Sequence, residues 1–383
     1  MRIGILTGGG DVPSLNTVIH DVTYRAAREN SASVIGLRRG WGSLIYMDPD
    51  NIEMDPDHAF YLNEEKVRGF DREGGTLLRT SRIQPSEVKY HPALQKYRNI
   101  DFFEGKRDMT QDVLKNLENL RIDILFAIGG DDTLKYARHL SKLGFPVIGI
   151  PKTMDGDVAG TDYCLGFNTA IERSNQYVTN LRSHLGSHER IGVIEVFGRH
   201  SGHTGLYTAL AAKPDRLVIP EVDFDIHRLA ELLVYDKKRN SSNYSMVIAS
   251  EGAKQLGETV VKENDKIDSY GHVKLGGIGK RIAGQLEELT GEDVMEENLR
   301  YLLRSGPPSP KDKTVASMFA NIAVDSAIKH VAGKLTAIRD GKVCLVELEE
   351  TKKSPTEVDV SRQYNSERYR PNYKGLVGVT VML

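Results

Sequence analysis

The chain has 383 residues, which is too long for one small hydrophobic core and predicts two domains or lobes. With 39% hydrophobic and 27% charged residues and a net charge of −2, it gives no reason to expect nucleic acid or an anionic membrane as a partner. Two cysteines without a CxxC pair exclude a disulfide framework and a thiolate zinc site, and no apolar run is long enough to span a membrane, so we expect a cytoplasmic protein.

The first predicted element is a strand over residues 2–6 that runs into a glycine-rich turn. The turn is Thr7–Asp11, with the sequence TGGGD, and a helix is predicted from about Leu15 to Arg28. Glycine-rich turns are common, but this one opens a β-α-β unit, where glycines let backbone amides approach a phosphate group. It lacks the GxGxxG spacing of a dinucleotide-binding loop, so we do not expect a Rossmann-type cofactor.

The next part of the chain adds a pair of arginines. Its predicted elements are a strand at 34–37, a loop at 39–42 and a helix at 110–120. We interpret Trp41, in that loop, as a packing residue. The segment Glu73–Arg82, EGGTLLRTSR, places Arg79 and Arg82 three residues apart. Two loop arginines are usually solvated, but beside a phosphate site they become candidates for a clamp.

The stretch from 124 to 157 alternates strands with polar loops. The predicted bounds are 124–128 for a strand, 133–143 for a helix and 147–150 for a second strand. Gly129-Gly130 ends the first strand and Pro151 ends the second. Both loops therefore leave the carboxyl ends of neighbouring strands, where open α/β sheets bind their ligands.

These two loops carry a set of side chains that suits phosphoryl transfer. The set is Asp131, Asp132, Lys152, Asp155 and Asp157. Carboxylates alone would repel phosphate, so their presence beside a glycine loop implies a bridging Mg²⁺. A lysine can meet the charge of the transferred group, and an aspartate can take the proton of the acceptor hydroxyl. A single Gly-Gly-Asp matches by chance, but two such loops one helix apart favour a functional site.

The second half repeats the pattern of strand, glycine-containing loop and helix. The predicted elements are helices at 170–185, 275–289 and 314–331 and strands at 191–196, 217–219 and 245–249. The loop Phe197–Gly202 follows one strand and Glu251 follows another, which predicts a second doubly wound lobe facing the first. His200 and His203 have no third ligand nearby, so zinc is not expected. We assign no function to the polar tail from Glu347.

With these residues in view, the chain resembles the phosphofructokinase family over nearly its whole length. The matching segments, in order, are ILTGGGDVPSLN, GGTLLRTSR, IGGDDT, PKTMDGD, GFNTA, RIGVIEVFGRHSG, SEGA and YLLRSG. Several motifs in one order are far more specific than any single motif. The resemblance implies an α/β fold of two Rossmann-like doubly wound lobes with the active site in the cleft between them. We expect 1–160 to form the first lobe with the donor loops, 161–305 the second with the sugar-phosphate site, and 306–383 a return to the first lobe and a tail.

The resemblance also implies a role for each candidate residue. Asp155 matches the base that takes the proton from the sugar's 1-hydroxyl, Asp157 and Lys152 support catalysis, and Asp131 matches the Mg²⁺-associated aspartate. Arg190 matches an arginine that reaches a neighbouring subunit's sugar phosphate, which implies a homodimer or homotetramer. The positions matching the phosphoryl-donor site are Gly9, Gly10, Arg82, Gly130, Asp132 and Thr133. The positions matching the sugar-phosphate site are Thr153, Arg190, Phe197, Gly198, Arg199, Glu251, Tyr301 and Arg304.

The sequence departs from the family pattern at a few of these positions. Tyr301 stands where ATP-using members often have histidine, Gly156 where the family usually has asparagine, and Met154 where it usually has isoleucine. The remaining arginine of the usual sugar-phosphate clamp has no clear match, and Arg300 is the candidate. These departures leave sedoheptulose 7-phosphate open as an alternative to fructose 6-phosphate.

Two positions bear on the phosphoryl donor. ATP-using members generally have glycine at the positions of Asp132 and Lys152, so their presence resembles the pyrophosphate-dependent branch. A carboxylate at 132 occupies space and adds negative charge where an α-phosphate would lie. An ammonium group at 152 can bind pyrophosphate and stabilise the leaving group. Some ATP-using relatives keep the lysine, so Asp132 carries most of the argument.

The sequence therefore predicts a Mg²⁺-dependent, reversible transfer from pyrophosphate to the 1-hydroxyl of fructose 6-phosphate, giving fructose 1,6-bisphosphate and phosphate. An ATP-dependent phosphofructokinase is the alternative. Lipid and NAD kinases also carry GGD loops, but Arg199, Glu251 and Arg304 at their family positions argue against a lipid substrate. A non-catalytic sensor of sugar phosphate would not need a base, so the joint presence of Asp131, Lys152 and Asp155 argues against it.

Overall fold

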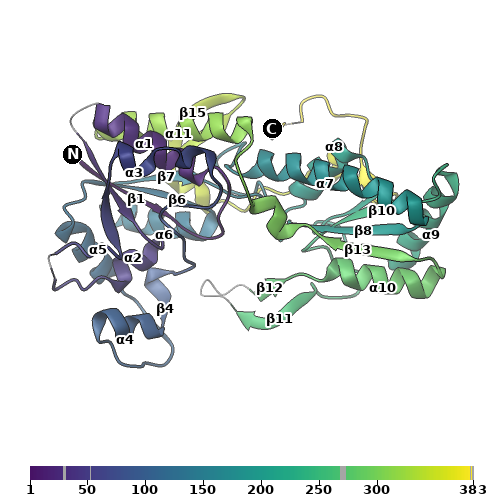
Figure 1. Cartoon of the computed structure of the whole chain (residues 1–383), viewed down its shortest axis with the longest axis horizontal. Coiled ribbons are helices and arrows are strands. Elements are labelled where there is room, and N and C mark those ends of the chain that lie inside the picture. Colours follow the sequence, from purple (N-terminus) through teal and green to yellow (C-terminus); the bar gives the residue numbers. More distant parts are fainter. Residues whose placement is uncertain (29–31, 52, 268–272, 380, 382–383) are drawn as a thin grey trace.

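The computed structural model describes residues 1–28, 32–51, 53–267, 273–379 and 381. The chain forms two α/β lobes that lie side by side, each built around its own parallel sheet (Figure 1). Among these residues, no helix combines the length and the apolar character that crossing a membrane would require.

The first lobe contains a 7-stranded sheet. Its strands, in spatial order, are β15 (Lys342–Glu347), β14 (Lys334–Arg339), β7 (Val147–Pro151), β6 (Ile124–Gly129), β1 (Arg2–Thr7), β2 (Ser33–Leu37) and β3 (Ala59–Leu62). The strands from β14 to β2 are parallel, and β15 and β3 pair antiparallel at the two edges. Ile3 pairs with Ile124 and Phe126 with Ile148, so the glycine turn and both polar loops leave the same sheet, as predicted.

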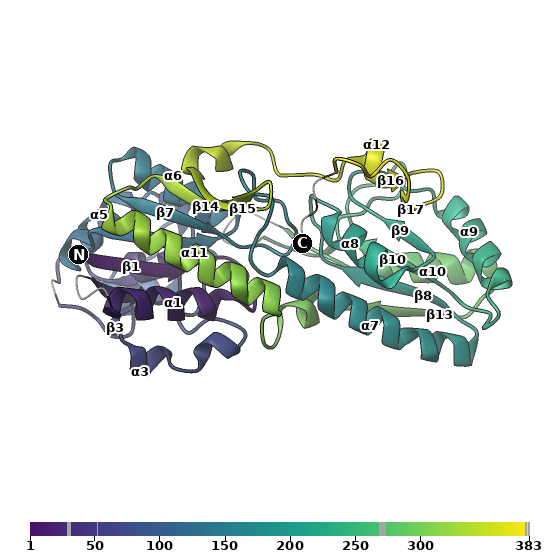
Figure 2. The ribbon, with the colours of Figure 1, turned by 90° about the horizontal axis from the view of Figure 1, so that it is seen from above.

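Helices cover both faces of this sheet, which explains why β6 is buried along its whole length. Ile3 and Ile5 pack in one cluster with α1 (Leu15–Arg28) and α11 (Pro310–Ile328), whereas Leu6 packs in another with α5 (Thr110–Asn119) and α6 (Asp131–Lys142). α1 and α11 lie side by side although they are far apart in the sequence (Figure 2).

The second lobe has a 4-stranded, all-parallel sheet. Its spatial order is β13 (Val294–Asn298), β8 (Ile191–Val196), β10 (Ser245–Ser250) and β9 (Arg216–Val218). Two helix pairs pack with it: α7 (Phe167–His188) with α8 (His203–Ala212), and α9 (Ile226–Arg239) with α10 (Ile278–Thr290). The predicted doubly wound lobes are thus confirmed.

Short elements complete the chain. They are the helices α2 (Trp41–Tyr46), α3 (Glu64–Val67), α4 (Pro92–Arg98) and α12 (Val360–Gln363), the strands β4 (Val88–Lys89), β5 (Lys106–Arg107), β11 (Lys262–Ile267), β12 (Val273–Leu275), β16 (Tyr364–Asn365) and β17 (Arg370–Pro371), and 3₁₀ turns at Phe70–Arg72, Pro85–Glu87, Arg300–Arg304 and Leu348–Lys352. Several sequence predictions were wrong in detail. Trp41 begins a helix instead of lying in a loop, and the helix predicted from 275 begins at Ile278. The helices predicted at 170–185 and 314–331 run over Phe167–His188 and Pro310–Ile328. Trp41 is fully buried, as a packing residue should be.

A buried carboxylate ties the returning helix α11 to the start of α7. Asp312 is fully buried and accepts hydrogen bonds from the Tyr163 hydroxyl at 2.7 Å and from the amides of Gly166 and Thr169 at 2.8 Å each. The Thr169 hydroxyl also bonds to it. This network fixes the point at which the chain passes between the lobes.

The tail crosses back to the second lobe (Figure 2). The Thr356 amide donates to the Asp157 carbonyl at 3.1 Å, and the Val358 amide donates to Glu221 Oε1 at 2.9 Å. Further along, the Tyr364 hydroxyl donates to the Leu217 carbonyl at 2.6 Å. The described part of the tail therefore contacts both lobes.

Candidate active site

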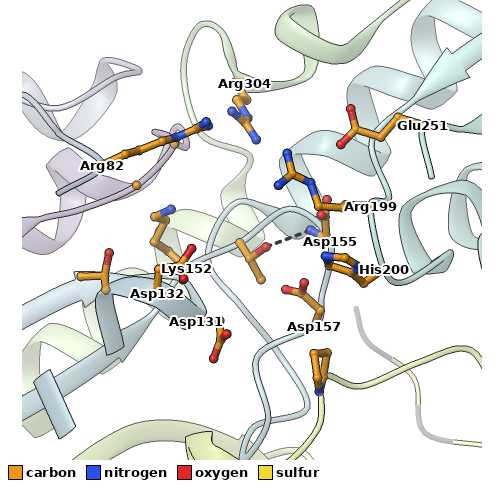
Figure 3. Close-up of a pocket in the computed structure, with 16 residues that line it drawn as sticks. Arg82, Asp131, Asp132, Lys152, Asp155, Asp157, Arg199, His200, Glu251 and Arg304 are labelled. Carbon is orange, nitrogen blue, oxygen red and sulfur yellow. Dashed lines mark hydrogen bonds between the residues drawn. The ribbon is translucent and has the colours of Figure 1, made fainter. Parts of the chain in front are cut away.

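Most of the predicted site residues meet in one cavity of about 400 Å³ between the lobes (Figure 3). They come from loops at the carboxyl ends of β1, β6, β7, β8 and β10 and from the turn after β13, so the two sheets point their ligand-binding ends at each other. The lining residues are Gly9, Gly10, Arg82, Gly130, Asp131, Asp132, Thr133, Lys152, Thr153, Asp155, Asp157, Arg199, His200, Glu251, Arg304 and Pro355.

The loops predicted to bind the phosphoryl donor interlock at the end of the first sheet. The Gly8 amide donates to the Ile128 carbonyl at 2.9 Å, and the Gly9 amide donates to the Ser81 carbonyl at 3.0 Å. A β-carbon on Gly8 would lie 2.5 Å from the Thr133 hydroxyl, so only glycine permits this approach. The loops therefore form one interlocked cradle whose glycines line the cavity, which suits phosphate groups.

Lys152 lies beneath this cradle and is only 5% exposed. Its amide donates to the Gly129 carbonyl at 3.1 Å, and its Nζ lies 3.3 Å from where a β-carbon on Gly9 would project. Burial, together with the nearby cations Arg304 and Arg82, lowers the pKa of Lys152 to about 7. A buried cation with cationic neighbours is an unfavourable arrangement until an anion enters the cavity.

Asp155 and Asp157 lie on one tight turn at the centre of the cavity (Figure 3). Gly156 between them has φ +66°, a left-handed conformation that glycine adopts freely. The Asp155 amide donates to the Thr153 hydroxyl at 3.2 Å. Burial raises the pKa of Asp155, and burial together with the Asp155 carboxylate raises the pKa of Asp157 to about 7.

The second lobe contributes Arg199 and Glu251 from neighbouring strand ends. The Glu251 amide donates to the Val196 carbonyl at 2.9 Å, and the Glu251 side chain lies beside Arg199 (Figure 3). Arg300 does not line the cavity; it lies behind Glu251, with Nη1 3.1 Å from Glu251 Oε2 and Nε 3.2 Å from Glu195 Oε1. We therefore find Arg300 supporting Glu251 and not open to a ligand.

Arg304 closes the far side of the cavity. Its guanidinium stacks over the Phe197 ring, 4.2 Å from the centroid. Its Nε is buried and has no hydrogen-bond partner among the described residues. Arg304 also lines the cavity, and a guanidinium group in that position is suited to bind phosphate oxygens.

A few predicted residues lie outside this cavity. Phe197 and Gly198 are buried beside it, and Tyr301 is 59% exposed, with its ring centroid 6.4 Å from that of Phe197. Arg190 lies at the opposite end of β8, where its Nε is 2.5 Å from Asp293 Oδ2. Their predicted roles in substrate binding stay predictions.

The sequence interpretation missed two lining residues, His200 and Pro355. His200 directly follows Arg199, so the same loop could have indicated it. Pro355 comes from the tail, and nothing in its neighbourhood in the sequence marks it. Of the two loop arginines, Arg82 lines the cavity, whereas Arg79 is exposed and lies outside it.

The cavity fits a Mg²⁺ ion that is held partly by substrate. In the described part of the chain, no group of three or more His, Cys, Asp or Glu is arranged to hold a metal by itself. Mg²⁺ usually keeps water ligands and binds one or two carboxylates together with substrate phosphates. Asp131 and Asp157 both line the cavity, and Asp131 is one of the carboxylates that raise the pKa of Asp157. This excess of negative charge favours a bound cation.

Comparisons with known proteins identify the family. A family model described as phosphofructokinase matches residues 2–327. The ATP-dependent 6-phosphofructokinase 3 of Streptomyces coelicolor is 34% identical over 367 residues, which cover 96% of this chain and 99% of that protein. The pyrophosphate–fructose 6-phosphate 1-phosphotransferase of Dictyoglomus thermophilum is 35% identical over 351 residues, covering 91% of this chain and 92% of that protein. The solved pyrophosphate-dependent phosphofructokinase from Marinobacter aquaeolei has a TM-score of 0.76 at 17% identity, covering 98% of this chain and 90% of its own, and bears on the fold alone.

Proposed function

The chain belongs to the phosphofructokinase family, and we propose that it transfers a phosphoryl group from pyrophosphate to the 1-hydroxyl of fructose 6-phosphate. The family supports phosphofructokinase activity, but similarity does not choose the donor, because relatives named for ATP and for pyrophosphate match this chain at 34% and 35% identity. The choice rests on the residues of the cavity.

The observation that carries the donor proposal is the position of Asp132. It lies in the first turn of α6 and lines the cavity beside the glycine cradle and Lys152. A donor longer than pyrophosphate would have to place its next phosphate near this carboxylate, and like charges brought together cost several kcal/mol. Pyrophosphate is too short to reach this carboxylate, and it contacts the ammonium group of Lys152.

In the proposed reaction, Asp155 takes the proton of the sugar's 1-hydroxyl, and the oxygen of that hydroxyl attacks one phosphorus of pyrophosphate. The P–O–P bond of pyrophosphate breaks, and orthophosphate leaves. The raised pKa of Asp155, caused by burial, makes its carboxylate a stronger base than an exposed aspartate. Lys152 and Arg82 lie on the donor side of the cavity and stabilise the negative charge that builds up as the P–O bond breaks.

Asp131, with Asp157 behind it, would hold Mg²⁺ against the donor. The ion supplies charge neutralisation on the phosphate oxygens when it is bound. Thr153, Arg199, Glu251 and Arg304, which line the same cavity as Asp155, would hold the sugar phosphate.

The proposal includes a homodimer or homotetramer in which Arg190 of one subunit contacts the sugar phosphate of another. Within one chain, Arg190 is too far along β8 to face its own cavity, and its partner Asp293 is 60% exposed. Sedimentation should show an oligomer, and Arg190→Ala should raise the KM for the sugar phosphate. A fully active monomer would rule this arrangement out.

The reverse reaction tests the donor. We expect the protein, given fructose 1,6-bisphosphate, Mg²⁺ and orthophosphate, to form pyrophosphate and fructose 6-phosphate, because exchange between a pyrophosphate bond and a sugar phosphoester involves a small free-energy change. A preparation that forms ATP from ADP but no pyrophosphate from orthophosphate would overturn the proposal while leaving the family assignment intact.

A further inference from the structure

Part of the wall of the active-site cavity comes from the C-terminal tail. Pro355 lines the cavity together with Asp157, although the two are far apart in the sequence. The tail leaves the first lobe at the 3₁₀ turn Leu348–Lys352 and reaches the second lobe at α12 (Figure 2). Residues 355–358, which we call the strap, therefore cross from one lobe to the other at the cleft.

The strap is fastened to each lobe through a backbone amide. The Thr356 amide donates to the Asp157 carbonyl at 3.1 Å, on the turn that follows β7 of the first lobe. The Val358 amide donates to Glu221 Oε1 at 2.9 Å, in the segment that follows β9 of the second lobe. The Val358 side chain is 4% exposed and packs in the hydrophobic core, so this end of the strap is buried. These contacts tie the two lobes together beside the reacting groups.

The same oxygen of Glu221 also holds the loop that carries Arg199. Glu221 Oε1 accepts a second hydrogen bond, at 2.8 Å, from the amide of Gly202, which ends the loop Phe197–Gly202. A β-carbon on Gly202 would lie 2.7 Å from Glu221 Oε2, so the close approach of the carboxylate requires glycine. One carboxylate oxygen thus joins the strap to the Arg199 loop.

The position of the Arg199 loop is set from two sides. Opposite Glu221, the Gly252 amide donates to the Gly198 carbonyl at 3.0 Å, and a β-carbon on Gly252 would lie 2.1 Å from the Arg199 carbonyl oxygen. Glu221 Oε2 is buried and has no hydrogen-bond partner among the described residues. Burying an unpaired carboxylate oxygen costs stability, so stability alone does not account for a glutamate at this position.

We propose that Glu221 is a positioning residue for the phosphoryl transfer and that it acts through the strap. The strap sets the spacing between the turn of Asp155 and Asp157 on the first lobe and Arg199 on the second. A sugar phosphate that contacts both lobes needs this spacing, since a displacement of about 1 Å can cost about 100-fold in rate. This role rests on the function proposed above, because its kinetic effect is expected in the binding of the sugar phosphate.

The kinetic test uses one variant at each end of the strap. Glu221→Ala removes the acceptor shared by Gly202 and Val358, and Thr356→Pro removes the amide that donates to Asp157. Each should raise the KM for fructose 6-phosphate about 10-fold, the effect of losing about one hydrogen bond, and should leave the KM for pyrophosphate nearly unchanged, since the glycine cradle lies in the first lobe. The double variant should be little worse than the worse single variant, because cutting either end already releases the strap.

Two further variants control for structural damage. Glu221→Gln keeps an acceptor oxygen for both amides, so it should restore a KM close to that of the wild type. Glu367→Ala removes an exposed glutamate further along the tail and should change neither kinetic constant. The positioning role is overturned if the effects of Glu221→Ala and Thr356→Pro are additive. It is also overturned if both variants lower the midpoint of urea unfolding while the KM for fructose 6-phosphate stays the same.

Hydrogen exchange tests the strap without any turnover, which separates this inference from the proposed function. In the absence of ligand, Thr356→Pro should speed amide exchange in residues 199–204, which the substitution does not touch, because Glu221 is then no longer held by the strap. Unchanged exchange there would overturn the positioning role. Faster exchange in a protein that shows no transfer from pyrophosphate would support the strap and contradict only the proposed function.

Discussion

The guanidinium of Arg304 occupies the space into which a side chain on Gly10 would project. Nη1 of Arg304 lies 2.6 Å from the position of a β-carbon on Gly10. Gly10 belongs to the loop after β1 in the first lobe, whereas Arg304 ends the turn after β13 in the second. The two lobes thus meet across the cavity through a contact that requires glycine on one side.

Gly10→Ala should displace Arg304 without unfolding the protein. The φ angle of Gly10 is not in the left-handed region, so alanine causes no backbone strain, and the end of an arginine side chain can move aside. Loss of one charge-assisted phosphate contact, about 1.5–3 kcal/mol, should raise the KM for the sugar phosphate roughly 10- to 100-fold. Gly284→Ala, where a β-carbon meets nothing within 4 Å, is the control. An unchanged KM would show that Arg304 does not contact the substrate.

Asp155→Asn should lower kcat by about 10²–10⁴-fold, the range for loss of a general base. Asparagine preserves the shape of the side chain, so calorimetric affinity for fructose 6-phosphate should stay close to that of the wild type. Steady-state kinetics and calorimetry on the same preparation separate the two effects. A variant with near wild-type kcat would remove Asp155 from the mechanism.

Lys152 should produce an alkaline limb in the pH profile. Burial and the neighbouring arginines hold its pKa at about 7 in the free enzyme, so the charged form is lost as pH rises through that value and kcat/KM for the donor should fall. Lys152→Met should lower kcat about 10²–10³-fold at pH values below 7. In the Lys152→Met variant this fall of kcat/KM at high pH should be absent. Pyrophosphate ionises in the same way in both experiments, so a difference between the two pH profiles comes from Lys152. The same limb in both proteins would contradict the assignment.

Asp312→Asn should destabilise the fold and not the chemistry. All the groups that bond to Asp312 donate hydrogen bonds to it, and the NH₂ group of asparagine would face some of them as a second donor. We therefore expect a loss of about 3 kcal/mol in the free energy of unfolding. Tyr163→Phe, which removes only one of these hydrogen bonds, should cost about 1 kcal/mol. Urea denaturation measures both. Midpoints equal to that of the wild type in both variants would mean that the network contributes little.

The parts of the site that could be predicted from the sequence share one property. Each follows a short apolar run that ends in glycine or proline, as Gly129 and Pro151 do, so the strand end and the polar loop are visible together. Parallel strands then bring those loops to one edge without further information. For this reason the glycine cradle, Lys152 and the aspartates could be predicted from the sequence.

The rest depends on contacts between distant segments. Pro355 reaches the cleft because Thr356 and Val358 bind a carbonyl and a carboxylate of other segments, which leaves no periodic pattern in the tail. The sequence does not distinguish the roles of Arg300 and Arg304, because both are arginines in the same short segment. The turn that joins them directs Arg300 toward Glu195 and Arg304 toward the cavity.

The most direct test of the proposed donor compares kcat/KM for pyrophosphate and for ATP with fructose 6-phosphate and Mg²⁺. The account predicts a preference for pyrophosphate of about 100-fold or more, because a like-charge contact at Asp132 costs several kcal/mol. Asp132→Gly should raise kcat/KM for ATP and lower it for pyrophosphate. Robust turnover with ATP by the unmodified protein, and none with pyrophosphate, would contradict the account.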